Sequence, residues 1–157
     1  MKDYVMVQKG DVRVALLGVF GKDALACAPT CELQFTDPVE AVKKTVAEIK
    51  KNEDADIIVC LSHSGTSEDE SKSEDEILAK KVPDLDVIVS AHTHTKLDEP
   101  IVHGDTYIVS AGEYGKYLGS LSLEQKDDGR WNMKEYKLTS IETDIAENAA
   151  TQEEINS

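Results

Sequence analysis

Apolar residues at helical spacing mark a helix in the first third of the chain. Asp37 can cap its start, Pro38 suits its first turn, and Glu40 completes a capping box. The apolar positions that follow lie three or four residues apart, with lysines between them: Val39, Val42, Val46 and Ile49. This pattern predicts an amphipathic helix that runs to about residue 52.

Two short, continuous apolar runs predict strands that are buried on both faces. They cover residues 56–61 and 86–90. Between them, Ser73 begins a second capping-box pattern, and Pro83 is expected to end the short helix that it opens. Buried strands that alternate with helices are typical of βαβ units with parallel strands. The predicted fold class is therefore α/β, a mixed β-sheet with flanking helices.

The two ends of the chain show other patterns. Residues 4–8 and 12–20 are rich in β-branched side chains and predict an opening hairpin, followed by an irregular loop over 21–35. Later runs predict antiparallel strands at 106–110, 118–124 and 131–138, with a turn at 102–105. We expect residues 1–141 to form the folded unit, and residues 142–157 to be a flexible tail or linker to an absent domain.

Charge and composition narrow the possible functions. The chain has 157 residues, 40% of them hydrophobic, and a formal net charge of −14. A surface this acidic repels a phosphate backbone, and we therefore expect no binding to a nucleic-acid polymer. No run approaches the ~18 apolar residues of a membrane span, and residues 1–10 contain no signal-peptide core, which leaves the compartment open. A phosphate-handling site here would need a local positive charge, and metal ions would supply it.

The cysteines do not predict a disulfide framework. The chain contains only Cys27, Cys31 and Cys60. Cys27 and Cys31 resemble half of a zinc knuckle, but no second pair stands at matching spacing, so we expect no metal role for them. Cys60 lies in an apolar run and is expected to be a small buried residue.

Three histidines lie directly after the predicted buried strands. His63 follows residues 56–61, and His92 and His94 follow residues 86–90. Ligand sites of open α/β sheets gather at the carboxyl ends of strands, so these side chains are expected to converge. In an extended segment the side chains of His92 and His94 would point to one side, with their Cα atoms roughly 6–7 Å apart. That spacing can serve two metal ions, and imidazole suits zinc, manganese and related ions.

Other interpretations of the polar residues stay open. A single histidine at a strand end is usually a polar loop residue, and His103, in a predicted turn, is interpreted as a surface side chain. A serine nucleophile beside His63 is disfavoured, because neighbouring side chains diverge and no Gly-x-Ser-x-Gly turn is present. The acid-rich residues 68–76 are interpreted as a solvated loop and helix start rather than a metal site.

Spaced sequence blocks give a more specific indication. The blocks Leu61-Ser62-His63-Ser64-Gly65, Ala91-His92-Thr93-His94-Thr95 and Ser110-Ala111-Gly112-Glu113-Tyr114-Gly115 resemble the calcineurin-like metallophosphoesterases. The subgroup is that of bacterial 5′-nucleotidases and 2′,3′-cyclic nucleotide phosphodiesterases. The resemblance covers about residues 12–141 and implies the C-terminal half of a four-layer αββα sandwich domain.

The resemblance also implies a chemistry. His63 and His92 match ligands of one divalent metal ion, and His94 matches a ligand of the other. The implied cofactors are Mn, Zn or a similar pair, and the implied reaction of the full-length protein is hydrolysis of nucleotide phosphate esters by a two-metal mechanism. The substrate-binding residues are not assigned.

Several blocks of the family are not found in this chain. It contains no Asp-x-His and no Asn-His, and Ala91 stands where the family usually has glycine. No catalytic residue is therefore assigned, and the isolated chain is expected to bind metal weakly and to be inactive. The alternatives are a non-catalytic remnant or one subunit of a split enzyme. An uncovered sheet face or edge predicts self-association or pairing with the missing half.

Overall fold

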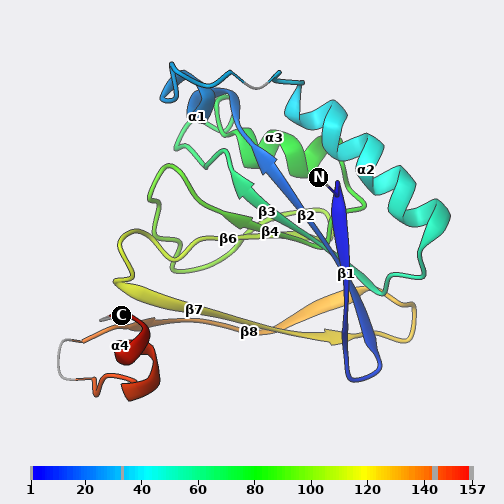
Figure 1. Cartoon of the computed structure of the whole chain (residues 1–157). Coiled ribbons are helices and arrows are strands. Elements are labelled where there is room, and N and C mark those ends of the chain that lie inside the picture. Colours follow the sequence, from blue (N-terminus) through cyan, green and yellow to red (C-terminus); the bar gives the residue numbers. More distant parts are fainter. Residues whose placement is uncertain (1, 33, 143–144, 156–157) are drawn as a thin grey trace.

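The computed structural model describes residues 2–32, 34–142 and 145–155 of the chain (Figure 1). In chain order its elements are β1 (Tyr4–Lys9), β2 (Val12–Phe20), α1 (Lys22–Ala26), α2 (Pro38–Asn52), β3 (Ile57–His63), α3 (Glu74–Lys81), β4 (Val87–Ser90), β5 (Ile101–His103), β6 (Thr106–Val109), β7 (Tyr117–Gln125), β8 (Trp131–Ser140) and α4 (Ala149–Ile155). No helix among the described residues is long and apolar enough to cross a membrane.

A six-stranded mixed sheet forms the centre of the fold. Its strand order is β1-β2-β3-β4-β6-β5. The inner strands β2, β3, β4 and β6 run parallel to one another, and the edge strands β1 and β5 are antiparallel to their neighbours. The predicted α/β class and mixed sheet are confirmed. The expectation of an antiparallel strand at residues 106–110 holds for the pairing of β6 with β5, but β6 also pairs in parallel with β4.

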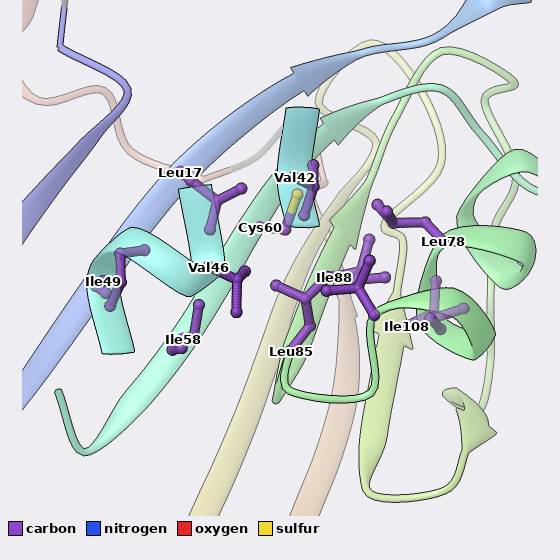
Figure 2. Close-up of a cluster of buried hydrophobic side chains, with 13 residues drawn as sticks. Leu17, Val42, Val46, Ile49, Ile58, Cys60, Leu78, Leu85, Ile88 and Ile108 are labelled. Carbon is purple, nitrogen blue, oxygen red and sulfur yellow. The ribbon is translucent and has the colours of Figure 1, made fainter. Parts of the chain in front are cut away.

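The helices α2 and α3 cover one face of this sheet. Figure 2 shows the hydrophobic core between these helices and the sheet, to which α2 contributes Val42, Val46 and Ile49. The strands contribute Ala15, Leu17, Ile58, Cys60, Ile88 and Ile108 from alternate positions. The helical spacing read from the sequence therefore marks the buried face of α2 correctly.

The two predicted capping boxes behave differently. The carboxylate of Asp37 accepts hydrogen bonds from the backbone N–H groups of Val39 and Glu40, at 3.1 and 3.2 Å, as expected for a helix cap. Ser73 occupies the cap position of α3, but its side chain makes no capping hydrogen bond. The first turn of α3 instead uses its acidic side chains for contacts with other elements, described below.

The β7–β8 hairpin packs against the opposite face of the sheet (Figure 1). Ile57, Val87 and Val109 are buried there against hairpin residues that include Leu121 and Trp131. The indole Nε1–H of Trp131 also donates a 2.7 Å hydrogen bond to the carbonyl oxygen of Asp56. The result is three layers: helices, the main sheet and a two-stranded sheet.

Part of that same face is not covered by the hairpin. Leu61 and Val89 are direct partners on β3 and β4, and their side chains are 52% and 40% exposed. Val5 and Val7 on β1 are exposed to a similar extent, and the pairing register places them on the same face through β2. We call Val5, Val7, Leu61 and Val89 the open apolar strip.

Two short helices lie in segments expected to be irregular. Residues 22–26 form α1 within the predicted loop 21–35, and residues 149–155 form α4 within the predicted tail, with no buried side chain. The assignment of residues 142–157 as a linker stays a prediction, and positions 143–144 and 156–157 lie outside the described residues.

Candidate metal centre

His63 and His92 meet at the carboxyl ends of two neighbouring parallel strands. Ser62 at the end of β3 pairs with Ser90 at the end of β4, so the residues that follow emerge side by side. The imidazole rings of His63 and His92 lie 5.0 Å apart between centroids, at 57°. Phe20 stacks on the other side of His63, at 5.6 Å and 6°. Two imidazoles, one at the end of β3 and one in the loop after β4, thus lie beside each other.

Two close approaches hold the loops that carry these histidines. Gly65 has a φ of +94°, and a Cβ placed on it would lie only 2.3 Å from Cγ2 of Thr93. The hydroxyl of Thr93 in turn accepts a hydrogen bond from the backbone N–H of Thr66, at 3.2 Å. A Cβ on Gly21 would lie 2.6 Å from Cα of Ser64. The loop after β3 is therefore locked against the loop after β4 and against the start of α1.

The segment around His94 differs from the expected extended geometry. His92 and His94 have φ values of 83° and 57°, so the chain turns in the left-handed region at both residues. The ring of His94 lies beside Tyr114, with centroids 5.3 Å apart, and its Nδ1 is 3.1 Å from a carboxylate oxygen of Glu113. The structure thus gives His94 a carboxylate neighbour of its own, which the sequence reading did not foresee.

The short helix α1 brings two further ligand types to His92. Oδ2 of Asp23 lies 2.9 Å from Nε2 of His92. Ligand atoms of Asp23, Cys27 and His92 all lie within 4.8 Å of one another, a separation that one metal ion could bridge. Asp23 was not a candidate from the sequence, and Cys27 was expected to have no metal role, because α1 falls in a segment that looks irregular.

The acidic side chains in the first turn of α3 contact three different parts of the fold. The carboxylate of Glu74 accepts hydrogen bonds from the backbone N–H groups of Lys22 and Asp23, both at 2.9 Å. Asp75, which is fully buried, accepts a 2.5 Å hydrogen bond from the hydroxyl of Ser62 and a 3.2 Å bond from the N–H of Gly65. Asp75 therefore holds the residues on both sides of His63.

Glu76 reaches a third element. Its carboxylate lies 2.7 Å from Nε2 of His103 at the end of β5, and Glu70 approaches the same nitrogen at 3.8 Å. The side chains of His103 and Glu76 are only 19% and 9% exposed. The interpretation of His103 as a surface residue was therefore wrong. The interpretation of residues 68–76 as fully solvated was wrong for Asp75 and Glu76, because both are drawn in by buried hydrogen-bonding partners.

Burial and ion pairs shift the acidity of groups near the histidines. Burial raises the pKa of Asp75, and the hydrogen bond from Ser62 opposes part of that rise. The ammonium of Lys116, at 2.6 Å, lowers the pKa of Glu113, and His94 adds to the effect. Glu113 is thus kept as a carboxylate beside His94.

The donor set fits divalent metal ions of the first transition row. His63 and His92 offer imidazole nitrogens, Asp23 and Glu113 offer carboxylate oxygens, and Cys27 offers sulfur. These are the donor types that zinc and related ions take in proteins. The two groups that contain His92 and His94 each combine an imidazole with a carboxylate.

Comparisons with known proteins identify relatives of this chain. The profile of the family described as Calcineurin-like phosphoesterase matches residues 10–96. The chain is 36% identical to the uncharacterized metallophosphoesterase YunD of Bacillus subtilis, over 69% of this chain and 24% of YunD. It is 29% identical to the 5′-nucleotidase of Vibrio cholerae, over 88% of this chain and 30% of that protein.

A solved structure gives the same result for the fold. The 5′-nucleotidase precursor of Thermus thermophilus superimposes with a TM-score of 0.68 and 28% identity, covering 88% of this chain and 29% of that one. The chain thus spans less than a third of the length of each of these relatives. The family implies divalent metal cofactors and phosphoester hydrolysis, in accord with the donor set. This chain therefore belongs to the calcineurin-like phosphoesterase family.

Proposed function

We propose that this chain supplies part of the metal centre of a two-metal phosphoesterase of the 5′-nucleotidase type. The observation that carries the proposal is the meeting of His63 and His92, whose ring centroids lie 5.0 Å apart at the ends of β3 and β4. Two imidazoles bound to one tetrahedral ion, with metal–nitrogen bonds of about 2.0–2.1 Å, have their ring centres about 5 Å apart. This arrangement of the two rings thus suits one shared ion.

In this proposal the three histidines serve two ions. His63 and His92 bind the first, and His94, with Glu113 beside it, binds the second. When bound, such ions neutralise the phosphate oxygens and activate the attacking water. Other residues of this chain hold the metal ligands in position. Asp75 fixes the loop of His63, Thr93 separates His92 from His94, and Lys116 keeps Glu113 ionised.

We further propose that the isolated chain is inactive. Two dications a few ångströms apart repel each other unless carboxylates lie between them. Among the described residues, Asp23 lies beside His92 and Glu113 beside His94, but neither touches both histidines. The bridging ligand and the proton donor would come from other polypeptide sequence, either a further part of a longer protein or a second subunit. A non-catalytic remnant that binds at most one ion is the alternative.

The proposed substrate class is a nucleotide phosphate ester. It rests on the names of relatives such as the Vibrio cholerae 5′-nucleotidase, with 88% of this chain matched. The net charge of −14 supports the need for metal ions, because an anionic substrate is otherwise repelled.

Calorimetric titration with Mn²⁺ and Zn²⁺ tests the metal centre. We expect His63→Ala and His92→Ala each to weaken binding of the first ion by more than about tenfold, since each removes a ligand. His94→Ala should affect a second, weaker binding event. His103→Gln is the comparison variant, because His103 lies at the end of β5 in a separate group with Glu70 and Glu76 that could also hold an ion, and the variant shows whether binding occurs there instead. Unchanged binding in the His63 and His92 variants, with loss in the His103 variant, would overturn the proposal.

A phosphatase assay separates the proposal from its alternative. The chain alone, with Mn²⁺ and a nucleoside 5′-monophosphate, should show no turnover. Addition of a polypeptide that carries the family's Asp-x-His and Asn-His blocks should produce metal-dependent turnover that His92→Ala abolishes. A chain that stays inactive in every such combination would favour the non-catalytic alternative.

We also propose that the open apolar strip mediates self-association of this chain. Val5 and Val7 on β1 lie on the same sheet face as the paired residues Leu61 and Val89, and each of the four is at least 40% exposed. Such a patch beside a covered region favours association. A second copy of the chain is the occupant we propose for the isolated protein.

A further inference from the structure

The group formed by Asp23, Cys27 and His92 has the composition of a thiolate metal site. Asp23 lies in the first turn of α1, and Cys27, four residues later, is the residue at its C-terminal cap, still in helical conformation, so both side chains lie on one face. Their ligand atoms and that of His92 all lie within 4.8 Å of one another. An aspartate, a cysteine and a histidine are all common zinc ligands.

We propose that Asp23 and Cys27 join His92 in binding one borderline-soft divalent cation, of the chemical class of Zn²⁺ or Co²⁺. The inference rests on the proposed function in taking His92 as a metal ligand, and it gives His92 a carboxylate and a thiolate as neighbours; His63 is not a member of this group of three. It contradicts the expectation from the sequence that Cys27 has no metal role.

The geometry needs little adjustment to bind an ion. With metal–ligand bonds of about 2.0–2.3 Å, tetrahedral ligand atoms lie about 3.3–3.8 Å apart. The three ligand atoms already lie within 4.8 Å of one another, and Asp23 and His92, now at 2.9 Å, must move slightly apart to bind a common ion. The Asp23 side chain is 73% exposed and free to rotate, whereas the His92 side chain is 14% exposed and stays in place.

The helix that carries the two new ligands is fixed in position. The carboxylate of Glu74 accepts hydrogen bonds from the N–H groups of Lys22 and Asp23, and the N–H of Gly21 donates to the carbonyl oxygen of His63 at 3.0 Å. The ammonium of Lys22 pairs with Asp37 at 2.8 Å. α1 is therefore anchored to the same loop that carries His63, although only a few residues long.

Charge also favours a cation at this position. A carboxylate and a thiolate together carry two negative charges, which offset the two positive charges of a divalent ion. Imidazole ligands alone would not offset the charge of the ion. The thiol loses its proton to solvent when the ion binds. Because thiolate is a soft ligand, the site should prefer Zn²⁺ and Co²⁺ over Mn²⁺ and Mg²⁺.

Cobalt titration of the reduced chain provides a readout that does not depend on activity. Binding of Co²⁺ should produce a near-ultraviolet thiolate-to-cobalt charge-transfer band with the intensity of one thiolate. Cys27→Ser should abolish the band, and Cys31→Ser, four residues further along, should retain it. Cys60 is buried in the core and should contribute nothing. Asp23→Asn should weaken Zn²⁺ binding by more than about tenfold, because it removes an anionic ligand.

Each outcome decides the point. A wild-type chain without the band, or a band lost in Cys31→Ser and kept in Cys27→Ser, overturns the inference. If the band is absent but His63→Ala and His92→Ala still weaken Mn²⁺ binding, the proposed function stands and only the thiolate site fails. Circular dichroism of each variant confirms that the fold is retained, so that a lost band reports a lost ligand.

Discussion

Replacement of Gly65 by alanine tests whether the two histidine loops are held together by their close contact. Gly65 has a φ of +94°, which an L-residue adopts only at a cost of about 1–2 kcal/mol. The new Cβ would also lie 2.3 Å from Cγ2 and 2.8 Å from Oγ1 of Thr93. Carbon atoms prefer about 3.5–4.0 Å, so the loops must separate, and overpacking of this kind costs about 1–3 kcal/mol. The expected total is about 2–5 kcal/mol of unfolding free energy.

Gly129→Ala is the matched control for the backbone part of this cost. Gly129 has a φ of +83° in the turn between β7 and β8, and a Cβ there meets nothing within 4 Å. It should lose only about 1–2 kcal/mol. Urea unfolding, followed by circular dichroism and by the fluorescence of the single tryptophan, Trp131, measures both variants.

The double variant Gly65→Ala with Thr93→Ala isolates the steric part. Removing Cγ2 and Oγ1 of Thr93 should relieve most of the clash, so the double variant should be more stable than the sum of the single effects by about 1 kcal/mol or more. Equal losses in Gly65→Ala and Gly129→Ala, with additive behaviour of Thr93→Ala, would refute the idea that this contact locks the loops.

Three further predictions follow from the core, the β5 contact and the open apolar strip. Burial raises the pKa of Cys60 to about 12, so its thiol keeps its proton in the folded chain while the unfolded chain loses it above about pH 9. The free energy of unfolding should therefore fall by about 1.4 kcal/mol between pH ~8 and ~10. Urea titrations at both pH values should show that this loss of stability is absent in Cys60→Ala. His103→Ala should destabilise the fold by about 1–3 kcal/mol, because it leaves the buried Glu76 carboxylate unpaired; thermal unfolding should show partial recovery when Glu76→Gln is added. Leu61→Glu should shift the sedimentation velocity of the chain from associated species to monomer, whereas Leu118→Glu, exposed on β7, should not; association that survives Leu61→Glu would exclude the strip as the interface.

Much of the fold follows from local sequence patterns. The spacing of Val42, Val46 and Ile49 identifies the buried face of α2, because a helix brings every third or fourth residue to one side. Continuous apolar runs identify β3 and β4, because helices cover one face of these strands and the β7–β8 hairpin covers part of the other. The expected burial on both faces was wrong for Leu61 and Val89, which the hairpin leaves exposed. The neighbouring positions of His63 and His92 also follow, since parallel strands that are adjacent in the sheet end at the same edge.

The remaining features depend on contacts that no local pattern carries. α1 is short and weakly patterned, and it is fixed by Glu74 from a distant helix, so Asp23 and Cys27 could not be assigned to a site. The left-handed turns at His92 and His94 also escaped prediction, because Thr93 turns toward Gly65 and Thr66 across the sheet edge. The parallel pairing of β6 depends on the position of β4, which the sequence of β6 does not specify.

Three consecutive acids at the start of α3 act on three separate targets. Glu74 binds the backbone of α1, Asp75 binds the loop of His63, and Glu76 binds His103 on β5. Successive residues of a helix point about 100° apart, so each target depends on the rotational setting of that one turn. Inserting or deleting a single residue just ahead of Glu74 would redirect all three carboxylates at once. This turn should therefore tolerate conservative exchanges of side chains far better than any change in chain length.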